Sequence, residues 1–121
     1  MRATAVTARR MPAGTAADDA ADLKKLAKQA GEAAQLLKLL GNEKRLLILC
    51  FLAARGEMTV GEIVDVVKLS QSALSQHLAK LRADGLVAFR RTSQTLHYHV
   101  ADKRALRVLQ VLKEIYCGDL K

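Results

Sequence analysis

Two cysteines and three histidines are the residues of this chain best suited to covalent or metal chemistry. Cys50 lies inside the apolar run RLLILCFLAA, and Cys117 stands near the C-terminus. His97 and His99 are two residues apart, a spacing that places both on one face of a strand. A thiol beside an imidazole can act as a nucleophile with its base, and both groups bind soft metals.

Neither chemistry has a complete set of residues in the sequence. A Cys50 nucleophile with His77 or His97 as its base also needs an oxyanion loop and an acid to orient the imidazole, and neither is visible. A closed zinc site takes about four ligands, so we favour a solvated or dimer-side strand face at His97 and His99. The sequence therefore predicts a protein that is not an enzyme and has neither a metal nor a cofactor.

The segment Leu69–Val87, LSQSALSQHLAKLRADGLV, has the pattern of a DNA-reading helix. Its apolar residues recur at helical spacing and form one face: Leu74, Leu78 and Leu81. Ser70 is a favourable N-cap, and Gly85 ends the helix. Short or flexible hydrogen-bonding side chains occupy the other face, as suits a helix inserted into a major groove. We predict DNA contacts from Gln71, Ser72, Ser75, Gln76 and Lys80.

The predicted contacts on this helix differ in kind. A glutamine can pair with adenine through two hydrogen bonds, and a serine hydroxyl can donate or accept one. Lys80 suits a phosphate contact. His77 stands at the border of the buried face, where it either contacts the DNA backbone or closes the core.

The preceding segments predict two further helices that would position this one. Asn42 can cap a helix that is apolar nearly all round and therefore central and buried. After a turn at Arg55–Met58, Thr59 and Glu62 have the spacing of a capping box. The short helix that they begin leads through a tight turn into the Leu69–Val87 segment. Two helices joined in this way are typical of a helix-turn-helix.

The residues after Gly85 alternate with the period of strands. Leu86–Arg91 and Thr95–Val100 predict a hairpin, which would be the wing of a winged helix. Polar side chains at or near its tip are candidate DNA contacts: Arg90, Arg91, Thr92 and Gln94. A charged hairpin tip also occurs on ordinary surfaces, but the formal net charge of +8 and the pI of about 9.9 favour a polyanionic partner.

Composition and the chain ends complete the predicted architecture. Half of the residues are hydrophobic and only 3% are aromatic, which favours a mainly α fold with a β-hairpin wing. We expect a disordered basic tail over residues 1–16 and one winged helix-turn-helix domain over residues 17–121. The tail is free of acids until Asp18 and so also resembles an organellar transit peptide, and Met11 is an alternative start. Without an apolar window of about 18 residues, we expect a cytoplasmic protein.

The core from about Glu32 to Cys117 resembles the ArsR/SmtB family of bacterial winged-helix repressors. The resemblance rests on LGNEKRLLIL, on the Leu69–Val87 segment and on the hairpin that ends in TLHYHV. It implies a homodimer built from the first and last helices, an inverted-repeat DNA operator and an inducer that releases the protein. The apolar stripes of the two terminal helices, the last of which begins at Asp102, agree with this expectation.

The inducer follows from a closer resemblance within the family. Some metal-sensing members carry Cys-x-Cys in the helix before the recognition helix, where this chain has Val64 and Val66. Others carry Asp and His on the last helix, which in this chain lacks histidine. ILC in the second helix and YC closing the last resemble the persulfide-sensing subgroup of BigR, SqrR and HlyU. That resemblance implies that Cys50 and Cys117 form a redox switch, bridged by reactive sulfur species when induced.

Several alternatives to the persulfide switch stay open. The same repressor can respond to general oxidants or to a metal ion, or both cysteines can be small buried hydrophobes. A purely structural dimerisation or antitoxin-like module is a further class, disfavoured by the Ser/Gln face of the recognition helix. A direct disulfide requires Cα atoms within about 4.4 to 6.8 Å, so a wider gap would favour a chain of extra sulfur atoms.

Overall fold

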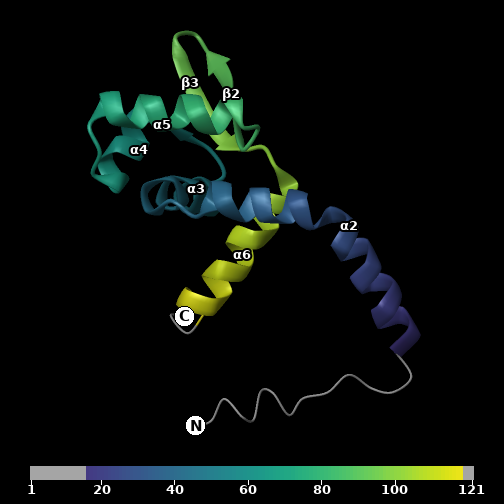
Figure 1. The fold of residues 1–121 in the computed structure, drawn as a ribbon. Helices are drawn as coiled ribbons and strands as arrows, with labels where there is room; N and C mark the ends of the chain where they lie inside the picture. Colours follow the sequence, from purple (N-terminus) through teal and green to yellow (C-terminus); the bar gives the residue numbers. More distant parts are fainter. Residues whose placement is uncertain (1–15, 119–121) are drawn as a thin grey trace. The chain divides into compact units, whose positions relative to one another are not determined.

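The computed structural model describes residues 16–118 (Figure 1). The tail expected over residues 1–16 lies outside this range, apart from Ala16. Contacts divide the chain into two units, residues 1–35 and 36–121. The elements are α2 (Ala16–Leu40), α3 (Glu43–Arg55), β1 (Met58–Thr59), α4 (Val60–Val67), α5 (Gln71–Ala83), β2 (Val87–Thr92), β3 (Thr95–Val100) and α6 (Lys103–Cys117).

Side-chain caps start the helices of the second unit, as the sequence predicts. The Asn42 side chain accepts a hydrogen bond from the backbone N–H of Arg45 at 3.0 Å and starts α3. Thr59 and Glu62 form a reciprocal capping box at the start of α4, with hydrogen bonds of 3.2 and 2.9 Å. Because each cap satisfies amide groups that have no helical partner, these residues fix where the helices begin.

The helix-turn-helix consists of α4, α5 and a three-residue turn. Lys68 adopts the left-handed conformation there, with φ 60° and ψ 41°. The hydroxyl of Ser70 then accepts the N–H of Ala73 at 3.0 Å and starts α5. Gly85, with φ 79°, follows the end of α5 and turns the chain into β2. The predicted helix-turn-helix is confirmed, and α5 ends at Ala83, two residues before Gly85.

The wing belongs to a three-stranded antiparallel sheet with the order β1-β3-β2. Figure 1 shows the β2–β3 hairpin beside α5. The prediction that Met58 belongs to a turn is wrong, because Met58 pairs with Tyr98 and begins strand β1. A two-residue strand has no readable period, and its partner lies far along the chain. The hairpin strand also begins at Val87, one residue later than predicted.

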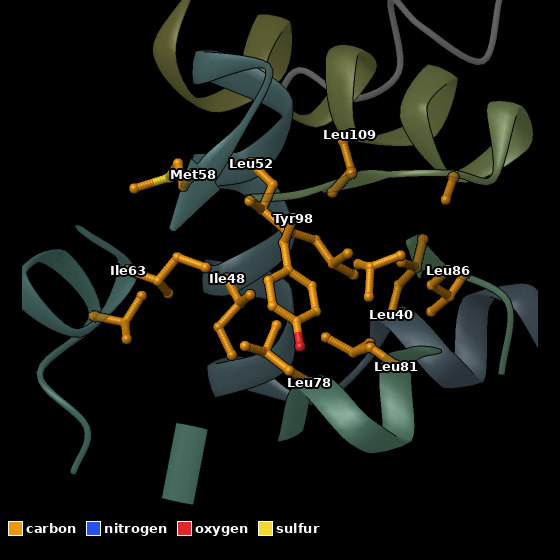
Figure 2. Close-up of a cluster of buried hydrophobic side chains, with 14 of the residues drawn as sticks. Leu40, Ile48, Leu52, Met58, Ile63, Leu78, Leu81, Leu86, Tyr98 and Leu109 are labelled. Atoms are coloured by element: carbon orange, nitrogen blue, oxygen red, sulfur yellow. The ribbon is translucent and has the colours of Figure 1, made fainter. Parts of the chain in front are cut away.

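The hydrophobic core lies around α3, whose residues Ile48, Leu49 and Leu52 are fully buried. The apolar residues of α4 and α5 pack onto the same cluster. Figure 2 shows the Tyr98 ring of β3 in the middle of these side chains. This packing fixes the back of α5 and leaves its polar face exposed. Within residues 16–118, no helix combines the length and apolar character needed to cross a membrane.

Candidate nucleic-acid interface and thiol pocket

The recognition helix α5 has a buried back and an exposed polar front. Leu74, Leu78 and Leu81 are at most 1% exposed. The front presents the side chains that the sequence singles out: Gln71, Ser72, Ser75, Gln76 and Lys80, all exposed. Because the helix is anchored by packing, these groups have a fixed direction, as base recognition requires.

His77 and Lys80 of α5 lie in different environments from the rest of this polar face. His77 is half-buried, at the border between the core and the exposed front, as the helical period predicts. Lys80 forms an ion pair with Asp84 at 3.6 Å, one turn along, while its side chain remains 61% exposed. The Asp84 side chain is only 25% exposed, whereas the ammonium group of Lys80 faces solvent, where it suits a phosphate contact.

The wing residues fall into two groups. Arg91 and Gln94 are exposed near the tip of the hairpin. Arg90 instead donates from Nε to both carboxylate oxygens of Glu57, at 2.9 and 3.1 Å. The hydroxyl of Thr92 bonds the ring Nε2 of His97 at 2.8 Å. Two of the four predicted wing contacts are therefore engaged within the protein.

The Glu57–Arg90 pair ties the loop before β1 to the wing. The hydrogen bond from Arg90 lowers the pKa of the Glu57 carboxyl, and the nearby imidazoles of His97 and His99 lower it further. The same contact raises the pKa of Arg90. Sequence reasoning missed this pair, because its residues are 33 positions apart and carry no local signal.

A second contact joins the recognition helix to the wing. The guanidinium of Arg82, in the last turn of α5, lies 4.5 Å from the centre of the Phe89 ring in β2. That ring meets Tyr98 edge-on, with 5.4 Å between centres. The helix, the wing and the core are thus connected through one row of aromatic contacts, which the sequence pattern does not reveal.

The two cysteines line one pocket of about 540 Å³ between α3 and α6. Cys50 is half-buried in α3, whereas Cys117, the last residue of α6, is exposed, and both thiols are free. Burial raises the pKa of the Cys50 thiol, and the proximity of Cys117 raises it further. The structure therefore brings together two thiols that are far apart in the sequence.

The other residues of the pocket are mostly apolar. They come from both helices and were not singled out by the sequence: Leu46, Leu47, Phe51, Ala53, Ala54, Leu109, Gln110, Leu112, Lys113 and Tyr116. Lys113 stands one helical turn before Cys117, a spacing that could have pointed to it. A pocket with apolar walls, two thiols and one ammonium group can hold a small molecule beside the sulfur atoms.

The histidines of the sheet form no such site. His97 and His99 lie on β3, and His97 bonds Thr92. Among residues 16–118, no three Cys, His, Asp or Glu side chains gather closely enough to hold a metal ion.

Comparison with known sequences gives a consistent picture. Residues 42–88 match the family model described as bacterial regulatory protein, arsR family. The transcriptional activator HlyU of Vibrio cholerae is 44% identical over 96 residues, which cover 79% of this chain and 88% of HlyU. The biofilm growth-associated repressor of Agrobacterium fabrum is 40% identical over 91 residues, 75% of this chain and 77% of the repressor.

Solved structures agree with the sequence matches. The transcriptional regulator HlyU from Vibrio vulnificus superposes with a TM-score of 0.74 at 44% identity, covering 79% of this chain and 99% of that one. The transcriptional repressor BigR from Xylella fastidiosa gives 0.71 at 35% identity, with 78% and 95% coverage.

Proposed function

The chain belongs to the ArsR family of bacterial regulatory proteins, and from this premise we propose that it is a homodimeric repressor controlled by its two thiols. Its relatives are transcriptional regulators, so the chain is a DNA-binding regulator and not an enzyme. The proposed inducers are reactive sulfur species that bridge Cys50 and Cys117.

The DNA-binding part of the proposal rests on α5 and the wing. The exposed face of α5 carries only small or polar groups at its first turns, and the whole chain has a net charge of +8. A dimer would present two such helices to an inverted-repeat operator, in major grooves about 34 to 36 Å apart. Phosphate contacts from lysine and arginine would supply most of the affinity and make it sensitive to salt.

Dimerisation is supported by exposed apolar side chains on the two terminal helices. On α6, Val111 and Ile115 are 48% and 64% exposed, and α2 exposes Leu23, Leu26 and Leu37 to a similar degree. Large apolar side chains exposed on a helix in this way are typical of a protein–protein interface.

The single observation that carries the switch is the shared pocket of Cys50 and Cys117. A sulfur bridge there would link α3, the centre of the DNA-binding core, to α6, which carries the proposed dimer surface. The bridge would therefore change the angle between the two recognition helices. A coupling of about 1 to 3 kcal/mol changes affinity roughly 5- to 150-fold.

Operator binding before and after persulfide treatment tests this proposal. The reduced protein is expected to bind its own promoter in a specific, salt-sensitive manner, and an organic persulfide should weaken that binding within the roughly 5- to 150-fold range. Cys50→Ser and Cys117→Ser should bind DNA and resist release, and a dithiol reductant should restore binding by the wild type. Release of Cys50→Ser by persulfide would contradict the switch, and hydrogen peroxide in parallel tests the general-oxidant alternative.

A further inference from the structure

The thiol pocket is much larger than a sulfur bridge requires. A water molecule takes about 30 Å³ in the liquid, and one or two linking sulfur atoms need space of that order. The pocket of about 540 Å³ is within the size range of small-molecule sites, roughly 300 to 1,000 Å³. The remaining space is sufficient for an organic group attached to the incoming sulfur.

From this space and its walls, we propose that the pocket binds organic persulfides, RS–SH, with a compact apolar R group, and takes sulfur from them in preference to charged donors. This inference rests on the proposed function and names the class of sulfur donor. Leu46, Leu47 and Phe51 form the α3 wall, and Leu112 and Tyr116 belong to the α6 wall. An apolar R group would gain from burial against these side chains.

The charge of the pocket gives the same preference. Among the described residues that line it, Lys113 is the one formally charged side chain. A peptide persulfide such as that of glutathione carries two carboxylates and an ammonium group. Any of these charges that packs against the apolar walls would lose water without gaining a partner, which is unfavourable. An apolar donor avoids this loss.

On α6, the two side chains assigned to the proposed dimer surface point away from this pocket. Val111 and Ile115 each stand two positions from Lys113, and so lie about 200° round α6 from it. Lys113 lines the pocket, whereas Val111 and Ile115 are exposed and do not line it. A partner packed on those two side chains therefore contacts the opposite side of the helix.

The difference between the two thiols gives the order of reaction. Cys117 is exposed and meets the donor first, whereas Cys50 is half-buried. The Cys117 thiolate attacks the terminal sulfur of RS–SH, so that its S–S bond breaks, RS⁻ leaves and Cys117–S–SH forms. The Cys50 thiolate then attacks the Cys117 sulfur and expels HS⁻, which leaves a disulfide.

Further transfers lengthen the bridge before it closes. Each additional donor adds one sulfur atom to the chain on Cys117 and leaves as a thiol. With n donors, the two thiols become a bridge with n − 1 inserted sulfur atoms, and the products are n RSH and one H₂S. The cysteine sulfurs are oxidised and the sulfane sulfur is reduced, so no other oxidant is needed.

Initial rates of bridge formation test this inference. The reduced protein would be mixed with butyl persulfide, glutathione persulfide or inorganic disulfide, trapped with an alkylating agent and weighed intact. Rates would be corrected for the reaction of each donor with a free cysteine peptide. We expect the corrected rate for butyl persulfide to exceed that for glutathione persulfide by about tenfold or more, the scale of selectivity of an apolar pocket.

A filled pocket provides the control for this experiment. Ala54 is exposed and lines the pocket, so Ala54→Phe should remove the preference for butyl persulfide while the reaction with inorganic disulfide continues. Ala54→Leu is a milder second variant. Ala79→Phe changes an exposed helical alanine outside the pocket and should keep the preference.

The outcomes separate this inference from the proposed function. Equal corrected rates for the two organic donors, or a preference that survives in both Ala54 variants, would overturn the inference and leave the thiol switch standing. If no donor bridges the thiols, the switch is wrong and the inference fails with it.

Discussion

Cys50 and Cys117 have the same chemistry but different environments. Burial and the neighbouring thiol raise the pKa of Cys50, so its reactive thiolate is scarce at neutral pH, whereas Cys117 is exposed. In the reduced protein, iodoacetamide should therefore modify Cys117 before Cys50. The rate at Cys50 should rise as the pH approaches its raised pKa, above that of a free thiol. Peptide mapping over a pH series measures both rates, and faster labelling of Cys50 at neutral pH would contradict this order.

The arginines of the wing are expected to differ in their effect on DNA binding. Arg91 is exposed near the tip, whereas the guanidinium of Arg90 bonds the Glu57 carboxylate. If Arg91 contacts a phosphate, Arg91→Ala should lower the slope of log affinity against log salt by about 0.9 per protomer, or about 1.8 for the dimer. Arg90→Ala should leave that slope nearly unchanged, because its charge is already paired.

Glu57→Gln is the matched control for the two arginine variants. It frees the charge of Arg90 and should raise the salt slope if the guanidinium then reaches DNA. Fluorescence anisotropy with labelled operator at several salt concentrations gives all the slopes. If Arg90→Ala lowers the salt slope as much as Arg91→Ala does, Arg90 itself contacts DNA, and the expected difference between the two arginines is wrong.

At the scale of elements, the start of α6 depends on one side chain. Asp102 accepts the backbone N–H groups of Arg104 and Ala105 at 2.8 and 3.0 Å. The side chain of Arg104, followed by these amides, lowers the pKa of the Asp102 carboxyl. Because this pKa is lower in the folded state, the contribution of Asp102 to stability is present above the pKa of an unfolded aspartate. It is lost as the pH falls through the lowered value.

Replacement of this cap has an expected size and pH dependence. Asp102→Ala should reduce the free energy of unfolding at neutral pH by about 1 kcal/mol, while Asp102→Asn, which keeps a capping oxygen, should lose less. The difference between wild type and Asp102→Ala should shrink in acid. Urea unfolding at several pH values measures this difference in the free energy of unfolding. A difference that stays constant down to strong acid would contradict the role of the ionised carboxylate.

How well the sequence predicts these features depends on how far apart the interacting residues are along the chain. The caps at Asn42, Thr59, Ser70 and Asp102 are set within three residues, so their positions are readable. Strand β1 and the Glu57–Arg90 pair depend on partners that are distant in the sequence, so the sequence pattern does not predict them. The Cys50–Cys117 pair came from a family resemblance, whereas the apolar walls around it emerged only when α3 and α6 were placed together.

At the scale of the whole molecule, the proposed repressor is a dimer formed in part through α6. Val111 and Ile115 are large apolar side chains exposed on one face of this helix. Ile115→Glu would place a charge in the proposed interface and should shift the protein to a monomer with much weaker operator binding. Gln110→Glu adds the same charge on the pocket side and should leave the dimer intact. Sedimentation velocity would distinguish them, and a dimeric Ile115→Glu protein would contradict this interface.

In the proposed mechanism, a bridge between Cys50 and Cys117 releases the protein from DNA. The most direct measurement is a persulfide titration in which intact mass and operator binding are read from the same samples. The fraction of DNA released should rise in proportion to the fraction of protein with bridged cysteines, and both should return to zero after reduction. DNA release by protein whose thiols remain unbridged, or full binding by fully bridged protein, would contradict this mechanism.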